Sequence, residues 1–318
     1  QALHRNTTAS NNTAVGRNAM EANTTGSENT AVGTLSLDAN TTGTNNASFG
    51  YDSLSANTTG VSNTALGDSA LKANTTASNN TAVGQSALLV NTTGQSNVAV
   101  GKSALSGNTT ASDCTAVGKD ALATNTVGQS NTAVGQSALA LNLNGTRNTA
   151  VGRTALQTNT SGSDNTSMGY FAMYRNTSGG SNSAFGKDAL LENTTGANNV
   201  AVGSLAGDTI TTGGGCVLLG ALADSSTVGG NYVNAIGYAV TGDAGYTTLG
   251  ESASDIRAAH GVATWATVSD ERYKKDIVDS TAGLSFVMSL TPRTWKYKTL
   301  GELPETFNAY EADSTEVF

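Results

Sequence analysis

The apolar residues of this chain recur with a fixed period of 17 residues. A glycine that closes Ala-Val-Gly, or a close variant of it, lies at Gly16 and at every seventeenth position up to Gly237, which makes fourteen copies. One unit, residues 57–73, reads N-T-T-G-V-S-N-T-A-L-G-D-S-A-L-K-A. No insertion or deletion interrupts the series. A constant period over so many copies indicates that equivalent residues stack on one another.

The repeat predicts short strands separated by tight corners. Helical repeats need thirty or more residues per unit, and these units carry Gly, Asn and Thr where a helix interior favours Ala, Leu or Glu. Short extended segments with Asn and Gly corners indicate a β-solenoid with one coil per unit. We therefore expect an all-β fold, a β-solenoid or β-roll of 17-residue coils, over residues 1–240.

Side chains alternate between two faces along each Thr-Ala-Val strand. The Val site is apolar in all fourteen copies, from Val15 to Ile236, so we expect its face to be buried in every coil. The site before it is Ala or Ser in nearly all copies, which indicates close approach to another backbone. A second apolar ladder runs from Met20 through Leu37 to Leu190.

Two further ladders consist of asparagine. One includes Asn6, Asn23 and Asn40, and the other includes Asn12, Asn29 and Asn46. Asn tolerates left-handed turns, and stacked amides form hydrogen bonds from coil to coil. Most of these residues also match the Asn-x-Ser/Thr acceptor pattern for N-glycans. Stacked corners are the favoured interpretation, because glycans on every coil would collide.

The coils are too thin to form a thick core alone. At roughly 4.8 Å per coil, fourteen coils form a rod about 65 Å long, and each coil contributes only a few modest apolar side chains. We therefore expect several chains to share one core, as a homotrimeric fibre.

Composition divides the chain and excludes several functions. Of 318 residues only 13% are charged, and the formal net charge is −8, so the basic surface of a nucleic-acid-binding protein is missing. No apolar run approaches the roughly 18 residues of a membrane span. Residues 1–240 hold 8 of the 17 aromatic residues, and the much shorter remainder holds 9. We therefore expect a repeat shaft over 1–240, a neck over 241–268 and a globular segment over 269–318.

The N-T-A-V-G unit resembles the head repeats of trimeric autotransporter adhesins. Those repeats are left-handed β-rolls whose small-apolar-Gly motif faces the trimer axis, and they are typically shorter than 17 residues. Similar Asn- and Thr-rich repeats occur in phage tail fibres. The resemblance covers residues 6 to about 240.

The C-terminal segment has the pattern of a small α+β unit. Asp279 and Ser280 predict a helix N-cap before Leu284, Phe286, Val287 and Leu290, and Pro292 ends that helix. Residues 293–298 alternate as a short strand that carries Trp295 and Tyr297.

The run Trp265-Ala-Thr-Val-Ser-Asp-Glu-Arg-Tyr-Lys274 resembles the start of the self-cleaving intramolecular chaperone at the C-terminus of phage tailspikes, endosialidases and tail fibres. That family nucleates a trimer and then cleaves a Ser-Asp bond. The resemblance implies Ser269 as nucleophile, Asp270 after the cut and Lys274 as partner base. The alternative is that Ser269 caps a turn. The resemblance covers about fifty residues, roughly half of a usual domain of this kind.

Other candidate sites are few. We expect no metal, because His4 and His260 are isolated, and no cofactor. Cys114 and Cys216 lie six coils apart, too far for a disulfide. The richest aromatic cluster of the repeats is a candidate contact with a host receptor, which could be a glycan, although ordinary packing is the alternative: Tyr170, Phe171, Tyr174 and Arg175. An ice-binding function requires Thr-x-Thr arrays, whereas Thr24 and Thr25 are adjacent.

These features together predict a structural and adhesive viral tail fibre. It would attach the virion to a host receptor, contact itself and other virion tail proteins, and contact neither nucleic acid nor a membrane interior. Any enzymatic activity would be self-cleavage of the chaperone. The alternative is a bacterial trimeric surface adhesin, which would end in a membrane anchor. A depolymerising tailspike would need an acidic cleft, which the repeats do not supply.

Overall fold

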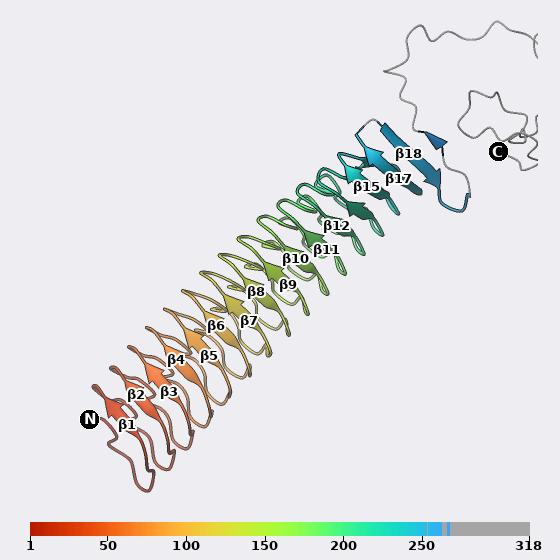
Figure 1. Ribbon diagram of the computed structural model, residues 1–318. Coiled ribbons are helices and arrows are strands. Elements are labelled where there is room, and N and C mark those ends of the chain that lie inside the picture. The colour runs from red at the N-terminus through yellow and green to blue at the C-terminus, as the bar shows by residue number, and fades with distance from the viewer. Residues whose placement is uncertain (253, 263–265, 268–318) are drawn as a thin grey trace, which may run out of the picture. The chain divides into compact units, whose positions relative to one another are not determined.

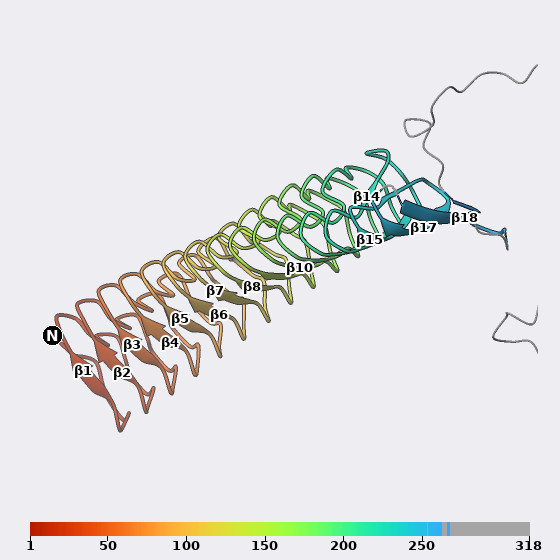
Figure 2. The same cartoon turned by 45° about the horizontal axis from the view of Figure 1, so that its top comes forward.

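The computed structural model describes residues 1–252, 254–262 and 266–267. The chain divides into two units, Gln1–Ser269 and Asp270–Phe318. The described part is all-β and forms a β-solenoid (Figures 1 and 2). The helix predicted after Asp279 and the strand predicted over 293–298 lie outside the described residues.

Each coil contributes one short strand to a continuous parallel stack. Thr115, Ala116 and Val117 pair with Thr132, Ala133 and Val134, their equivalents one period later. The other coils pair in the same register, with the last at Leu219 against Ile236. The strands are β1 (Thr13–Val15), β2 (Thr30–Val32), β3 (Ala47–Phe49), β4 (Thr64–Leu66), β5 (Thr81–Val83), β6 (Val98–Val100), β7 (Thr115–Val117), β8 (Thr132–Val134), β9 (Thr149–Val151), β10 (Thr166–Met168), β11 (Ser183–Phe185), β12 (Val200–Val202), β13 (Val217–Leu219) and β15 (Asn234–Tyr238).

The interior of the solenoid is a column of small and medium side chains. The middle residue of the strand points inward, and Ala116 and Ala133 are fully buried. The segment after the repeat glycine, here called the return segment, lies against it and contributes a buried Ala and Leu in most coils, such as Ala121 and Leu122. In coil 10 the Ser167 hydroxyl on β10 donates to the Ala172 carbonyl of the return segment at 2.8 Å. The inward face of each strand is thus covered by the return segment of its own coil.

The expectation that the Val face is buried is wrong for the single chain. Val15 and Leu66 are 58% and 48% exposed, and Met168 is 41% exposed. The side-chain alternation was assigned correctly, but the Ala site, rather than the Val site, faces the interior. The coil is so thin that an Ala or Ser occupies the inward site in every coil but one, and the larger side chain points outward. The exception is the buried Leu218, which fills the space left by Gly207.

The repeat glycine is fixed by close backbone approach. Gly118 has φ of 135°, and a Cβ atom there would lie 2.5 Å from the carbonyl oxygen of Gly135 in the next coil. The buried Leu ladder also has a positive φ, but there it carries a large side chain. Leu105, for example, has φ of 50°. A left-handed conformation costs a non-glycine residue about 1–3 kcal/mol. Burying a leucine side chain offsets this by about 1.5–3 kcal/mol.

The predicted Asn stacking is confirmed and lies inside the solenoid. The side-chain amide of Asn108 donates to Asn91 Oδ1 at 2.8 Å and to the Ala111 carbonyl at 3.0 Å. In the second ladder Asn97 donates to the same Ala111 carbonyl at 2.9 Å. These side chains are fully buried. Their amide nitrogens are occupied in coil-to-coil bonding, as the stacked-corner interpretation requires.

The solenoid changes its period near its C-terminal end. β14 (Asp224–Ser225) and β16 (Thr241–Gly242) form a separate parallel pair. β17 (Tyr246–Glu251) pairs in parallel with β15, so that Gly250 stacks on Gly237 after 13 residues. β18 (Ser254–Ala259) then runs antiparallel to β17 and pairs with β19 (Ala266–Thr267). An antiparallel strand ends the parallel stack in this way.

Candidate receptor hollow and outward strand face

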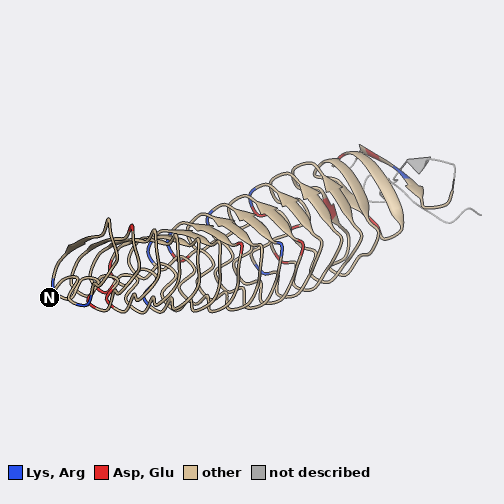
Figure 3. Ribbon diagram, turned by 90° about the horizontal axis from the view of Figure 1, so that it is seen from below, with Lys and Arg blue, Asp and Glu red and all other residues tan. Residues whose placement is uncertain are grey.

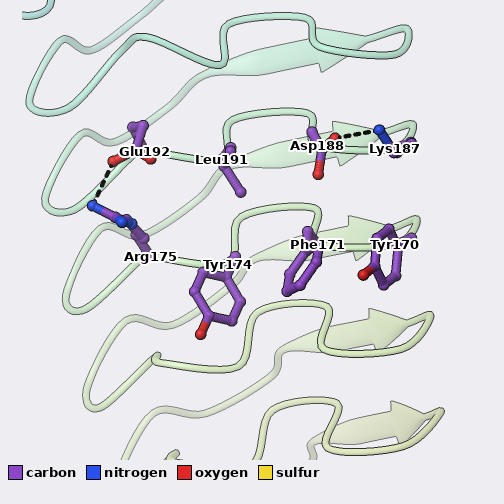
Figure 4. Close-up of a pocket in the computed structure, with 8 residues that line it drawn as sticks. All are labelled: Tyr170, Phe171, Tyr174, Arg175, Lys187, Asp188, Leu191 and Glu192. Atoms are coloured by element: carbon purple, nitrogen blue, oxygen red, sulfur yellow. Dashed lines mark ion pairs between the residues drawn. The ribbon is translucent and has the colours of Figure 1, made fainter.

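Two surface features of the described residues are candidates for function. The first is a hollow of about 390 Å³ formed by the return segments of two successive coils. We call it the aromatic hollow, and Figure 4 shows the residues that line it: Tyr170, Phe171, Tyr174, Arg175, Lys187, Asp188, Leu191 and Glu192. The structure therefore brings together all four residues of the candidate receptor contact. Their role as such a contact stays a prediction.

The aromatic rings of the hollow form one contiguous group. The Tyr170 and Phe171 ring centroids are 4.2 Å apart, and Phe171 meets Tyr174 edge-to-face at 4.9 Å. The Arg153 guanidinium, from the preceding coil, lies 5.6 Å from the Tyr170 centroid. Such ring contacts hold side chains in defined orientations.

Two ion pairs lie beside the rings (Figure 4). Arg175 pairs with Glu192 at 2.9 Å, and Lys187 pairs with Asp188 at 2.8 Å. The hydrogen bond and charge of Asp188 raise the pKa of the Lys187 ammonium above its usual value. The residues that line the hollow therefore carry two cations and two carboxylates, which sum to a formal charge of zero. Arg153 lies outside this lining, at the Tyr170 ring.

Sequence reasoning missed the second coil of the hollow. Lys187, Asp188, Leu191 and Glu192 follow the four predicted residues by one period each. In a solenoid, residues one period apart are neighbours in space, so the repeat itself was the signal that could have found them.

The second feature is the outward face of the strand stack, here called the strand face. It consists of the first and third residues of β1–β13 and β15, which are largely Thr and apolar residues. The most exposed large apolar side chains on it are Val15, Phe49, Leu66, Val98, Val117, Val134, Met168, Phe185, Val200, Val202 and Ile236. Such a long contiguous apolar surface is typical of an interaction site. Figure 3 shows how few charged residues the coils carry.

The strand face and the aromatic hollow lie on opposite sides of the coil. The inward side of β10 faces the return segment, as the bond from Ser167 to Ala172 shows. Tyr170 and Tyr174 belong to that same return segment and are partly exposed on its outer side. An assembly through the strand face would therefore leave the hollow accessible.

The Thr24 ladder is engaged within the solenoid. The Thr24 hydroxyl donates to the Thr41 carbonyl at 3.0 Å, and Thr109 donates to Thr126 in the same way at 3.1 Å. These hydroxyls hold successive coils together, and the ice-binding interpretation gains no array of free hydroxyls from this ladder.

Two carboxyl groups lie together near the end of the solenoid. Burial raises the pKa of Asp208, and the charge of neighbouring Asp224 raises it further. Burial also raises the pKa of Asp224, although a hydrogen bond from Thr209 at 2.7 Å opposes this. Both carboxyls therefore keep a proton to higher pH than an ordinary aspartate does.

The two cysteines occupy positions in the second Asn ladder. Cys114 is buried, and its thiol lies 3.3 Å from the Gly128 carbonyl. This contact replaces the hydrogen bond that the Asn side-chain amide donates in the other coils. Cys216 makes the equivalent contact with Gly230 at 3.2 Å. Burial raises the pKa of both thiols.

Among the described residues no group of three His, Cys, Asp or Glu is arranged to hold a metal ion. The same part of the chain contains no helix long and apolar enough to cross a membrane.

The predicted self-cleavage residues lie outside the described residues. Ser269, Asp270 and Lys274 fall in the C-terminal segment, so their roles stay predictions.

Comparison with known proteins identifies that C-terminal segment. Residues 269–314 match the family described as chaperone of endosialidase. Comparison of the chain with curated proteins and with solved structures finds no match. The matched family implies self-association as a trimer. A β-solenoid of 17-residue coils followed by a chaperone-of-endosialidase segment fits a tail fibre with a C-terminal chaperone.

Proposed function

We propose that the chain is the shaft of a viral tail fibre that holds a host-attachment surface away from the virion. The observation that carries the proposal is the chaperone-of-endosialidase match at residues 269–314, which follows a repeat with an unbroken 17-residue period from Gly16 to Gly237. The fibre is a homotrimer, and its other partners are virion tail proteins and a host receptor.

The strand face supplies the shared core of this trimer. In one chain its apolar residues are left partly in water, and Leu66 and Met168 remain more than 40% exposed. Each Å² of apolar surface removed from water contributes about 25 cal/mol. Three strand faces that meet at one axis would bury these ladders in every coil. The small interior of each coil is then supplemented by a second core between chains.

A chaperone is needed because the uniform repeat does not specify how three chains align. With a uniform period, three chains can pair in many registers that differ by one coil and have similar energies. A trimerising domain at one end selects one register, and the solenoids then grow from that end. Cleavage between Ser269 and Asp270, with Lys274 as base, would release the chaperone and make assembly irreversible.

The test is the intact mass of the purified full chain beside that of Ser269→Ala. We expect the wild type to lose a C-terminal piece that begins at Asp270, and the variant to stay whole. A wild type that stays whole under conditions in which it forms a trimer would contradict self-cleavage at this bond. A monomeric product in both samples would contradict the fibre itself.

The second candidate function is a bacterial trimeric surface adhesin, which the N-T-A-V-G repeat favours. Immunoelectron microscopy of the source material discriminates between the two. Label on tails of virus particles supports the fibre, and label on the cell envelope without particles supports the adhesin.

A further inference from the structure

We infer that the aromatic hollow binds a neutral sugar ring of a host-surface glycan. The inference rests on the proposed function, because it assigns a ligand class to the attachment surface of the fibre.

The lining matches the two surfaces of a pyranose ring. Tyr170, Phe171 and Tyr174 form a joined aromatic wall, and Leu191 adds an aliphatic contact. The C–H groups on one face of a sugar ring pack against the negative face of an aromatic ring. Ligand sites commonly combine such an apolar wall with a few polar groups, in volumes of about 300–1,000 Å³. The hollow, at about 390 Å³, holds a small saccharide.

The rim selects a neutral ligand over an acidic one. Glu192 and Asp188 accept hydrogen bonds, and Arg175 and Lys187 donate them. Hydroxyl groups both donate and accept, so a sugar engages both members of each pair. An anionic ligand would meet the two carboxylates that already neutralise these cations. Charge complementarity therefore favours an uncharged ring with several hydroxyls.

Phe171 occupies a position that the repeat normally gives to a small polar residue. Its φ is 56°, and the equivalent residues of nearby coils are Ser137, Thr154 and Asp188. Leu35, Leu205 and Leu222 occupy the same repeat position with φ of 59° or 60°, so the left-handed conformation belongs to the repeat. The aromatic ring, rather than the backbone, is what sets coil 10 apart at this position. The side chain contributes nothing to the buried column, because Ala172 and Met173 already fill it.

The position of the hollow suits attachment by a trimer. It lies on the outer side of the return segment, opposite the strand face that forms the shared core. A homotrimer therefore presents three equivalent hollows, and weak binding at each is strengthened when several are engaged on one surface.

Neighbouring coils provide a matched way to remove the hollow. Coil 8 carries Gln136, Ser137 and Ala140 at the places of the three rings. The variant Tyr170→Gln, Phe171→Ser, Tyr174→Ala therefore restores residues that the fold already accommodates. It should melt no lower than the wild type. Tyr51→Ala is the control, because Tyr51 occupies the same repeat position as Tyr170 and is 56% exposed.

The experiment is saturation-transfer NMR of the full chain with methyl glycosides of glucose, galactose, mannose and N-acetylglucosamine, and with methyl glucuronide as the acidic probe. We expect transfer to at least one neutral glycoside by the wild type and by Tyr51→Ala. The triple variant should show at least a tenfold weaker signal. No transfer to any neutral glycoside, an unchanged signal in the triple variant, or transfer to the glucuronide alone would each overturn the inference.

The same samples are examined by sedimentation equilibrium, which separates the two proposals. A trimer that binds no neutral glycoside overturns the sugar site and leaves the fibre intact. A monomer that binds a neutral glycoside through the three rings overturns the fibre and supports the sugar site.

Discussion

Single residues in this solenoid act as rungs of ladders, so a substitution affects two neighbouring coils as well as its own. Cys114 breaks the second Asn ladder between Asn97 and Asn131 and replaces an amide bond with a weak thiol contact at 3.3 Å. We predict that Cys114→Asn raises the free energy of unfolding by about 1 kcal/mol, the usual net value of a hydrogen bond. Urea unfolding followed by circular dichroism measures this. A lower midpoint would show that the ladder is not the source of stability at this site.

The carboxyl pair gives a prediction of pH dependence. Both Asp208 and Asp224 have folded-state pKa values raised above the ordinary 3.8. The folded state therefore holds protons to higher pH than the unfolded state, and stability falls as the pH rises from about 4 through the folded-state pKa.

We expect Asp208→Asn to raise the urea midpoint at pH 7 and to reduce its decline between pH 4 and 7. Asp113→Asn, which removes an exposed carboxylate, is the control for the change in net charge. A decline of the same size in Asp208→Asn and wild type would contradict the assignment to this pair.

At the level of the coil, the repeat glycine decides whether successive units stack. A Cβ at Gly118 would lie 2.5 Å from Gly135 O, and backbone atoms cannot move aside as side chains do. We predict that Gly118→Ala lowers the free energy of unfolding by about 3 kcal/mol or more, from left-handed strain and overlap together.

The matched control is Gly229→Ala. The nearest atom to a Cβ there is Thr212 Oγ1 at 3.3 Å, the end of a side chain that rotates. Thermal unfolding of the two variants compares them directly. Equal melting temperatures would mean that the period is not fixed by this backbone contact.

The coil also shows which features the sequence could predict. The 17-residue period, the Asn stacking and the Leu ladder follow from repetition, because identical residues at identical spacing must lie above one another. The direction of the Val side chains did not follow. An alternating strand has two faces, and only the thickness of the coil decides that Ala116 points inward and Val117 outward.

The sequence alone predicted only half of the residues that line the candidate site, because the other half become neighbours only when the coils are stacked. Tyr170, Phe171 and Tyr174 stand out by composition, whereas Lys187 and Glu192 are ordinary surface residues until the coils are stacked. The opposite placement of hollow and strand face required knowledge of which way each strand faces.

For the whole molecule, the central claim is that chains assemble through the strand face. It is tested by adding charge to that face: Val117→Lys, Val134→Lys and Met168→Lys in one variant. The control variant carries Val127→Lys, Leu141→Lys and Leu143→Lys, which add the same charge at somewhat more exposed apolar residues outside the strands.

The one measurement is the molar mass of both variants and of the wild type by sedimentation equilibrium. Each is assembled as the full chain and then cut at a protease site inserted between Ser269 and Asp270, so that the chaperone segment no longer holds the chains together. We predict a trimeric mass for the wild-type face and the control, and a monomeric mass for the strand-face variant. A monomeric mass for the wild-type face, or a trimer that survives three lysines on the strand face, would contradict the account.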